Sequence, residues 1–144
     1  MNTETQSGNT MQRLVNETKG HAVIDSGCAT NVCGNKWAMN YIHNTPEKHR
    51  ENIKRFQSKR QFAFGGGHTV KSMGKIMIPC WLAGIKGYLE TEIVECDIPL
   101  LLSRETMEVH KFILNFAERT VQWNGHTIKL KLTTTGHYGM PIHI

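Results

Sequence analysis

Aspartate is the rarest charged residue of this 144-residue chain, because Asp25 and Asp97 are the only two among its 12 acidic residues. Any chemistry that requires an aspartate therefore has two candidates. Cysteine is scarce too, and no C-x-x-C spacing occurs among its four copies, Cys28, Cys33, Cys80 and Cys96. This pattern argues against a disulfide framework and favours small, buried thiols.

Long apolar runs are also missing. The longest, at residues 98–102, contains Pro99 and is far shorter than the roughly 20 residues that span a bilayer, so we expect no membrane partner. The first ten residues lack the cationic start and the apolar stretch of a secretory signal. We therefore expect an intracellular protein with reduced thiols.

What remains is the composition of a globular protein. The chain is 39% apolar and 20% charged, with 13 glycines against 4 prolines, and its length suits one domain. Its 17 lysines and arginines exceed its 12 acids, which gives a net charge of +5. This excess favours acidic partners only weakly, because net charge affects solubility and nonspecific binding before it determines function.

Most of the patterned segments predict β-strands. Residues 21–25 form a short apolar run that ends at Ser26-Gly27, and a hairpin is expected where Gly65–His68 joins residues 61–64 to residues 69–81. Asn124-Gly125 is the strongest short hairpin signal. Further strands are expected at residues 88–95, 98–102, 112–116, 120–123 and 127–132, with a turn at 84–87.

Helices are expected to be few and short. Ser103 is the expected N-cap of a helix over residues 103–110. In the basic insert at residues 35–60, Pro46 divides two helical pieces, the second of which has Thr45 as its N-cap.

The chain is expected to divide into a tail and one domain. Residues 1–19 are predicted to be a flexible polar segment, in which Met11, Leu14 and Val15 begin a strand. Residues 20–144 then form a mostly β domain with one or two short helices.

The segment AVIDSGCAT, at residues 22–30, places an aspartate where a rigid turn can aim it into a cleft. The preceding strand fixes Asp25, the hydroxyl of Ser26 can bond across the turn, and Gly27 lets the chain fold back closely behind the carboxylate. By itself, the triplet is also typical of an ordinary turn after a strand.

Because the later motifs follow in the same order, the chain resembles the retropepsin family of aspartic proteases over about residues 22–116. The hairpin phrase FxFGxG is similar to the flap of that family, and IPLLLSR is similar to the segment that opens its helix. Together with a closing GHYxxPI, these phrases look most like proteases of LTR retrotransposons. The resemblance implies a closed acid-protease β barrel with a flap hairpin.

The resemblance also implies roles for particular residues. Asp25 is the catalytic residue, and its turn is supported by Ser26, Gly27, Leu101, Leu102 and Ser103. The flap, which covers an extended peptide substrate, consists of Gly65, Gly66, Gly67 and His68.

Three features depart from the family pattern. Ser103 stands where retropepsins commonly have glycine, so its extra atoms must fit against the catalytic turn. Residues 28–31 offer no acid to pair with Arg104, which therefore needs another partner. The basic insert at residues 35–60 is longer than the minimal family pattern.

Peptide hydrolysis of this class requires two carboxylates that share a proton. Asp97 is followed by Ile98-Pro99 rather than Ser/Thr-Gly, so the chain has one such motif. The second Asp25 is expected from a second chain, in a homodimer whose active site lies on the two-fold axis. One Asp25 would act as general base on water, while its protonated partner polarises the carbonyl.

The expected activity is thus cleavage of a retroelement polyprotein, without cofactor or metal, in the cytoplasm or within virus-like particles. Three alternatives stay open. The first is a catalytically inactive dimer that is kept for binding. The second is weak nucleic-acid contact through residues 48–60, although Glu47 and Glu51 favour a solvated helix face there. The third is a zinc site, although the spacing of Cys28 and Cys33 is not a recognised one.

Overall fold

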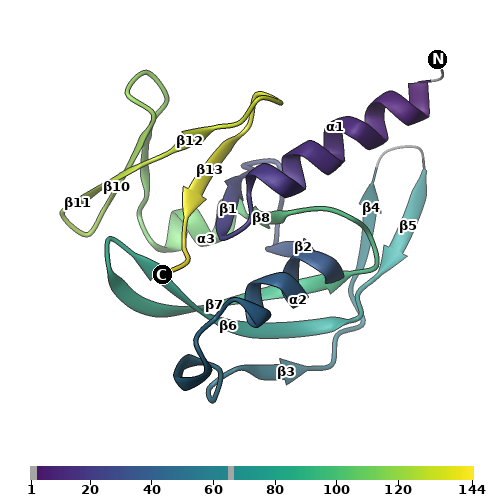
Figure 1. Ribbon diagram of the computed structural model, residues 1–144, viewed down its shortest axis with the longest axis horizontal. Helices are drawn as coiled ribbons and strands as arrows, with labels where there is room; N and C mark the ends of the chain where they lie inside the picture. The colour runs from purple at the N-terminus through teal and green to yellow at the C-terminus, as the bar shows by residue number, and fades with distance from the viewer. Residues whose placement is uncertain (1–2, 65–66) are drawn as a thin grey trace.

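The computed structural model describes residues 3–64 and 67–144, and strands dominate it (Figure 1). The helical elements of these residues are α1 (Thr3–Glu17), α2 (Asn35–His43), the 3-10 turn η1 (Glu47–His49) and α3 (Arg104–Val109). The strands are β1 (His21–Ile24), β2 (Val32–Gly34), β3 (Lys54–Phe56), β4 (Gln61–Phe64), β5 (His68–Lys71), β6 (Gly74–Leu82), β7 (Ile85–Val94), β8 (Leu100–Leu102), β9 (Ile113–Asn115), β10 (Thr120–Trp123), β11 (His126–Lys129), β12 (Lys131–Leu132) and β13 (Tyr138–Pro141). No helix in the described ranges has both the length and the apolar character that a membrane span requires.

Eight strands form one open sheet, in the order β12-β13-β1-β8-β2-β7-β6-β3. Its edge strands, β12 and β3, do not pair with each other within the described residues, so the expected closed barrel is not found. Edge strand β3 consists of exposed Lys54, Arg55 and Phe56, and charged side chains are a common way to leave a sheet edge unpaired. Two smaller sheets, β11-β10-β9 and β4-β5, complete the β structure.

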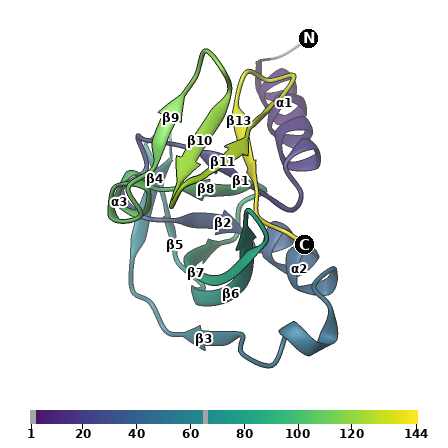
Figure 2. The ribbon, with the colours of Figure 1, turned by 90° about the vertical axis from the view of Figure 1, so that its left-hand side faces the viewer.

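Helices cover both sides of the large sheet (Figure 2). On one side, α2 buries Trp37, Ala38 and Tyr41 in the main apolar core. The Tyr41 hydroxyl shares its proton between the carbonyl oxygens of Pro79 in β6, at 2.8 Å, and of Ile142 just after β13, at 3.2 Å, so this helix is attached to β6 and to the segment that follows β13. On the other side lies α3, which adds Met107 to the same core.

Several local expectations are confirmed. Asn124 and Gly125 both have positive φ and join β10 to β11, with Trp123 opposite His126. Ser103 is the N-cap of α3. Strands β4 and β5 form the expected hairpin, although β5 ends at Lys71 and the long strand β6 begins separately at Gly74.

The strand expected near the N-terminus is wrong, because residues 3–17 form helix α1. Leu14 and Val15 are buried, and the end of the helix is attached to the loop between β12 and β13. There, the carboxylate of Glu17 accepts hydrogen bonds from the backbone N–H and the hydroxyl of Thr134, which lower the pKa of Glu17. A local pattern of apolar residues cannot predict such tertiary contacts, because the partners are distant in the sequence.

The second helical piece expected after Pro46 is also wrong. Only one 3-10 turn, η1, forms there, and strand β3 follows it. The Thr45 hydroxyl does not cap η1, since it donates to the carbonyl of Tyr41 at 2.7 Å. Residues 48–60 therefore do not form the solvated helix face that was expected, in which acidic and basic side chains four residues apart would pair.

Gly34 is needed because β2 crosses very close to the segment before β8. Its N–H donates to the carbonyl of Ile98 at 3.1 Å, and a Cβ at this position would lie 2.2 Å from the carbonyl oxygen of Cys96. The carbonyl oxygen and the nitrogen of Ile98 would also lie within 3 Å, and all three obstructing atoms belong to the backbone, so a side chain cannot be accommodated by a rotamer change.

We expect Gly34→Ala to lower the free energy of unfolding by about 2 kcal/mol or more, because overpacking forces the backbone to move. Gly87→Ala is the matched control, since nothing lies within 4 Å of a Cβ there. Its expected change is within about 0.5 kcal/mol. Urea unfolding followed by circular dichroism measures both, and equal stabilities of the two variants would contradict the prediction.

Candidate active site

Asp25 directly follows β1, which is enclosed by two neighbouring strands. β1 pairs with β8 in parallel and with β13 in antiparallel fashion, and Ile24 lies opposite Leu102. The N–H of Asp25 continues this ladder by donating to the carbonyl of Leu102 at 3.2 Å. Ala22 and Val23 of β1 are fully buried, so packing within the sheet fixes the backbone position from which the Asp25 side chain extends.

The turn after Asp25 is closed by its own backbone. The N–H of Gly27 donates to Asp25 Oδ1 at 3.1 Å, and the N–H of Cys28 donates to the Asp25 carbonyl at 3.1 Å. Asp25 is half-buried, whereas Ser26 and Gly27 are exposed. The carboxylate therefore stands on a rigid turn at the surface of the single chain.

Two expected features of this turn differ in detail. The Ser26 hydroxyl makes no hydrogen bond within the described part of the chain, so the backbone rather than Ser26 closes the turn. A Cβ on Gly27 would lie 3.4 Å from Asp25 Oδ1, which is an ordinary contact. The fold of one chain therefore does not itself require glycine at position 27.

The segment Leu101–Ser103 lies directly behind the turn. Leu102 and Ser103 are buried, and the N–H of Arg104 donates to the carbonyl of Cys28 at 3.0 Å. The extra atoms of Ser103 fit because its hydroxyl oxygen accepts a hydrogen bond from the N–H of Thr106 at 3.2 Å. Serine thus caps α3 without disturbing the turn.

Asn31 is a site residue that the sequence analysis missed. Its Oδ1 accepts from the N–H of Ser103 at 2.8 Å and from the hydroxyl of Thr106 at 3.1 Å. Its Nδ2 donates to the carbonyl of Glu90 at 3.0 Å. The uncharged side chain of Asn31 thereby joins the segment after the turn to α3 and to β7. In the sequence, the only indication of this role is that a polar asparagine stands beside the apolar Val32 and Cys33.

Among residues 3–64 and 67–144, Arg104 has its ion-pair partner at the surface. Its Nε lies 3.5 Å from Glu108 Oε1, and both side chains are about two-thirds exposed. Such pairs contribute little stability, because water screens them. The turn and α3 are therefore connected by the Asn31 side chain and by the backbone hydrogen bond from Arg104 to Cys28, and not by an ion pair of Arg104.

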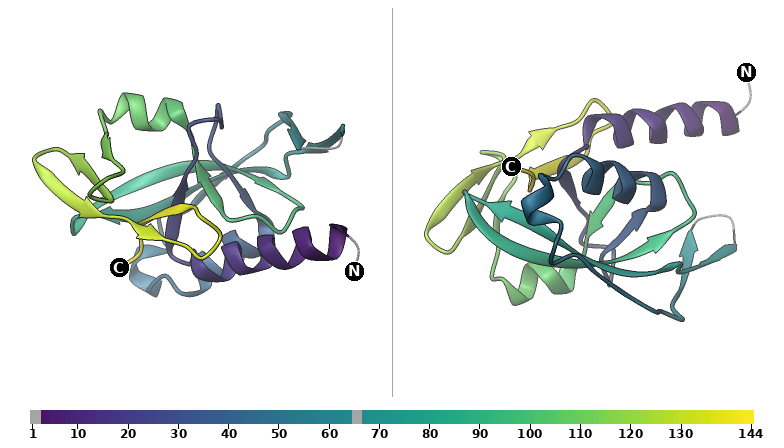
Figure 3. Two further views of the ribbon diagram at one scale, coloured as in Figure 1. Left: turned by 90° about the horizontal axis from the view of Figure 1, so that it is seen from above. Right: turned by 60° about the horizontal axis from the view of Figure 1, so that its bottom comes forward.

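The β4–β5 hairpin packs beside the turn. Its Phe62, Phe64 and Val70 contact a small apolar cluster that also contains Cys28 and Leu101, around the buried residues Val32, Val94 and Ile98. In the left view of Figure 3, the loop after β1, helix α3 and this hairpin rise on the same side of the large sheet. The hairpin and the aspartate turn thus share one small core.

Only part of the expected flap lies within the described residues. Gly65 and Gly66 lie outside them. Gly67 has a φ of +78°, and His68 pairs with Phe64 at the end of the hairpin. Both Gly67 and His68 are exposed.

The thiol nearest the turn is not an activated nucleophile. Burial raises the pKa of Cys28, and the neighbouring Asp25 carboxylate raises it further. Burial also raises the pKa of Cys33 to about 12 and that of Cys80 to about 11. Since a thiolate is the reactive form, these cysteines are protonated structural residues at neutral pH.

The comparisons with known proteins agree with this geometry at the level of the fold. One matching solved structure is the retroviral protease-like domain of Ddi1 from Leishmania major, with a TM-score of 0.51 and 14% sequence identity. The match covers 78% of this chain and 93% of that domain. The chain has a retropepsin-like fold. No protein-family model matches the sequence, and a search of curated proteins finds no match.

Within this retropepsin-like fold, we expect Asn31→Ala to lower the free energy of unfolding by about 1–3 kcal/mol, because it leaves the buried N–H of Ser103 without an acceptor. The exposed Asn52, which donates to the Tyr88 hydroxyl at 3.1 Å, supplies the control variant Asn52→Ala. Its expected effect is within about 0.5 kcal/mol. Thermal and urea unfolding measure both, and a stability of Asn31→Ala equal to wild type would refute the role of Asn31.

Proposed function

We propose that this protein is an aspartic endopeptidase that acts as a two-fold homodimer, with one Asp25 from each chain. The observation that carries the proposal is Asp25 itself, a half-buried carboxylate at the end of a central strand, in a turn that β8 and α3 support from behind. The other aspartate, Asp97, lines a separate cavity beside residues of α1 and α2. A second aspartate for the same site is therefore expected from a second chain.

The chemistry follows from two carboxylates in contact. At a separation of about 3 Å, as in aspartic proteases generally, two carboxylates cannot both be ionised. The ionised Asp25 accepts a proton from the attacking water, and the protonated partner donates a hydrogen bond to the scissile carbonyl. The pair titrates as one unit with two shared apparent pKa values.

The β4–β5 hairpin is proposed to act as the flap. The proposed flap residues are Gly65, Gly66, Gly67 and His68, the first two of which lie outside the described residues. Backbone N–H groups of this segment would donate to an extended peptide while the hairpin excludes water. Support comes from the apolar cluster that the hairpin shares with Cys28 and Leu101. We propose retroelement polyproteins as the substrates, because the motifs around Phe62, Ile98 and Tyr138 resemble those of LTR retrotransposon proteases.

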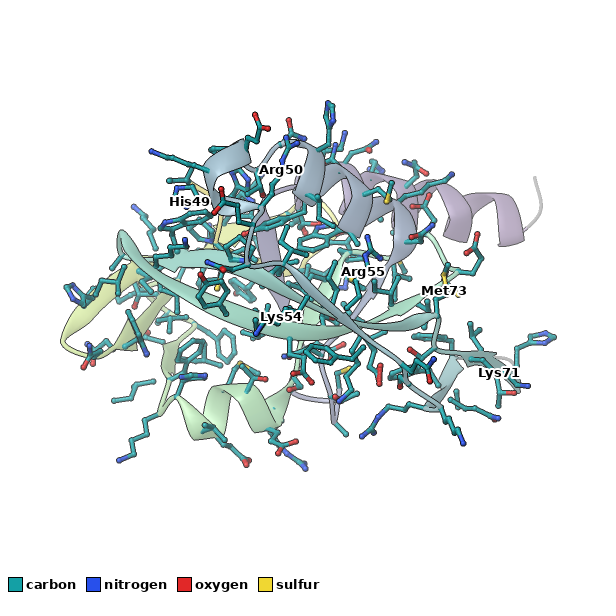
Figure 4. The ribbon with its side chains drawn as sticks, turned by 90° about the horizontal axis from the view of Figure 1, so that it is seen from below. His49, Arg50, Lys54, Arg55, Lys71 and Met73 are labelled. Carbon is teal, nitrogen blue, oxygen red and sulfur yellow. The ribbon has the colours of Figure 1, made fainter. Side chains whose placement is uncertain are left out.

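A retropepsin-like dimer without activity that binds nucleic acid is the alternative. It is favoured by the basic edge of the large sheet, where the exposed Lys54 and Arg55, both labelled in Figure 4, lie on β3. Cations on an edge strand also serve to prevent edge pairing, so this observation is less specific than the aspartate turn. Retention on immobilised nucleic acid that Lys54→Glu and Arg55→Glu abolish would favour this alternative.

We expect Asp25→Asn to abolish peptide cleavage while leaving the dimer intact, because the amide cannot accept the proton of water. Asp97→Asn is the matched control, since it changes the only other aspartate, and it is expected to retain cleavage. Cleavage of precursor segments followed by mass spectrometry measures activity, and sedimentation measures the dimer. A pepstatin-type inhibitor should block the wild-type protein. Wild-type cleavage rates in Asp25→Asn, or cleavage by a strictly monomeric protein, would overturn the proposal.

Gly27 offers a test of the dimer that is separate from the chemistry. One chain has room for a methyl group at position 27, so we expect Gly27→Ala to change the free energy of unfolding by no more than about 0.5 kcal/mol. Two copies whose Asp25 carboxylates meet would also bring their exposed Gly27 residues together. The same variant should therefore weaken dimerisation and cleavage by about tenfold, a change of about 1.4 kcal/mol. Unchanged sedimentation and cleavage would place Gly27 outside the contact.

A further inference from the structure

Glu92 carries a carboxylate that is buried at the base of the β4–β5 hairpin. It lies in β7, and its side chain is only 3% exposed. Its Oε1 accepts from the hydroxyl of Ser58 at 2.5 Å. Its Oε2 lies 3.0 Å from the hydroxyl oxygen of Ser72, whose single proton it shares with the carbonyl oxygen of Gly74 at the same distance. Arg60 Nε lies 3.8 Å from Oε1. Since Ser58 precedes β4 and Ser72 follows β5, one carboxylate holds both ends of the hairpin.

The hairpin depends on such an anchor. In the described part of the chain, β4 and β5 pair only with each other, and an isolated two-stranded sheet is marginally stable in water. Beyond its apolar contacts, its base is closed by the N–H of Ser72, which donates to the carbonyl of Arg60 at 2.9 Å. Ser72 Oγ in turn accepts from the N–H of Gly74 at 3.0 Å, which connects this base to β6.

The backbone of Glu92 extends the connection to the aspartate turn. Its N–H donates to the carbonyl of Asn31 at 3.0 Å, and Glu92 lies opposite Val32 where β2 pairs with β7. Asn31 in turn accepts from the N–H of Ser103 behind the turn. A continuous path of hydrogen bonds therefore runs from the support of Asp25 through Glu92 to the ends of the hairpin.

We propose that Glu92 is a positioning residue that fixes the β4–β5 hairpin relative to the Asp25 turn, so that the hairpin is held in place to bind an extended peptide. Hydrogen bonds to an ionised acceptor are stronger than those between neutral groups, and burial protects them from competition by water. The part of this inference that concerns peptide binding rests on the proposed protease function; the part that concerns the hairpin does not.

Glu90 provides the matched control on the same strand. It lies two residues before Glu92, and its carboxylate pairs with Lys75 at 3.0 Å, but the two side chains are 50% and 40% exposed. This pair joins β7 to β6 and touches neither end of the hairpin. Removal of the Glu90 charge should therefore leave the hairpin unaffected.

Hydrogen exchange of backbone amides tests the anchor directly. In Glu92→Ala, we expect exchange in residues 61–64 and 68–71 to become about tenfold faster, because local opening needs less free energy. Glu92→Gln should fall between Glu92→Ala and wild type, since its amide oxygen still accepts one hydroxyl. Glu90→Gln should match wild type. If Glu92→Ala does not fold, Ser58→Ala and Ser72→Ala remove the same contacts one at a time.

A second control separates positioning from general stability. Val121→Ala removes a buried side chain from β10, in a different sheet, and should destabilise the protein without faster exchange in the hairpin. Hairpin exchange at the wild-type rate in the Glu92 variants would overturn the proposal. So would acceleration spread evenly over the chain in both the Glu92 and the Val121 variants.

Kinetics with a peptide substrate test the consequence for binding. We expect Glu92→Ala to lower kcat/KM by about tenfold, mainly through a higher KM, and Val121→Ala to leave KM unchanged. An unchanged KM in Glu92→Ala would overturn the role in peptide binding. If the wild-type protein cleaves no peptide, the proposed protease function fails, and the exchange measurements still decide whether Glu92 anchors the hairpin.

Discussion

The parallel pairing of β1 with β8 is the constraint on which the candidate site depends. It joins two segments that are far apart in the sequence and places Ile24 opposite Leu102. The last bond of this pairing, from the Asp25 N–H to the Leu102 carbonyl, positions the residue that carries the carboxylate. β8 ends at Leu102, and α3 follows after Ser103. In the first turn of α3, the N–H of Arg104 donates to the Cys28 carbonyl and the N–H of Thr106 donates to the Ser103 hydroxyl oxygen. The turn, the strand behind it and the helix thus form one unit.

Hydrogen bonds between uncharged groups, rather than an ion pair, hold the Asp25 turn, β8 and α3 together. A buried ion pair gains attraction but loses hydration of both charges, and the loss can exceed the gain. The carboxamide of Asn31 avoids this cost, since its oxygen accepts two hydrogen bonds and its nitrogen donates one. Arg104 can then remain at the surface. Near the hairpin, the buried carboxylate of Glu92 accepts a hydrogen bond from Ser58, lies within hydrogen-bond distance of the Ser72 hydroxyl, and has the Arg60 guanidinium 3.8 Å away.

Sequence patterns predicted those parts of the structure that local chemistry determines. The Ser103 cap, the Asn124-Gly125 turn and the strand before Asp25 each depend on a few adjacent residues. Thr45 and Pro46 match the residue pattern that typically starts a helix. In the structure, however, the Thr45 hydroxyl donates to the carbonyl of the buried Tyr41, and no α-helix follows. Helix α1, the open sheet, Asn31 and Glu92 depend on partners distant in sequence, which no local pattern contains. The retropepsin-like fold was predictable from the order of motifs rather than from any one of them.

The hydrogen bonds of the Asp25 carboxylate are relevant to the proposal that the active site needs two chains. Oδ1 accepts from the Gly27 N–H, whereas Oδ2 accepts no hydrogen bond from residues 3–64 or 67–144. An oxygen without a hydrogen bond from its own turn can share a proton with a second acid, and the other aspartate of the sequence, Asp97, lines a separate cavity. The same exposed turn that makes Asp25 accessible to water therefore also leaves it accessible to its counterpart in a second copy.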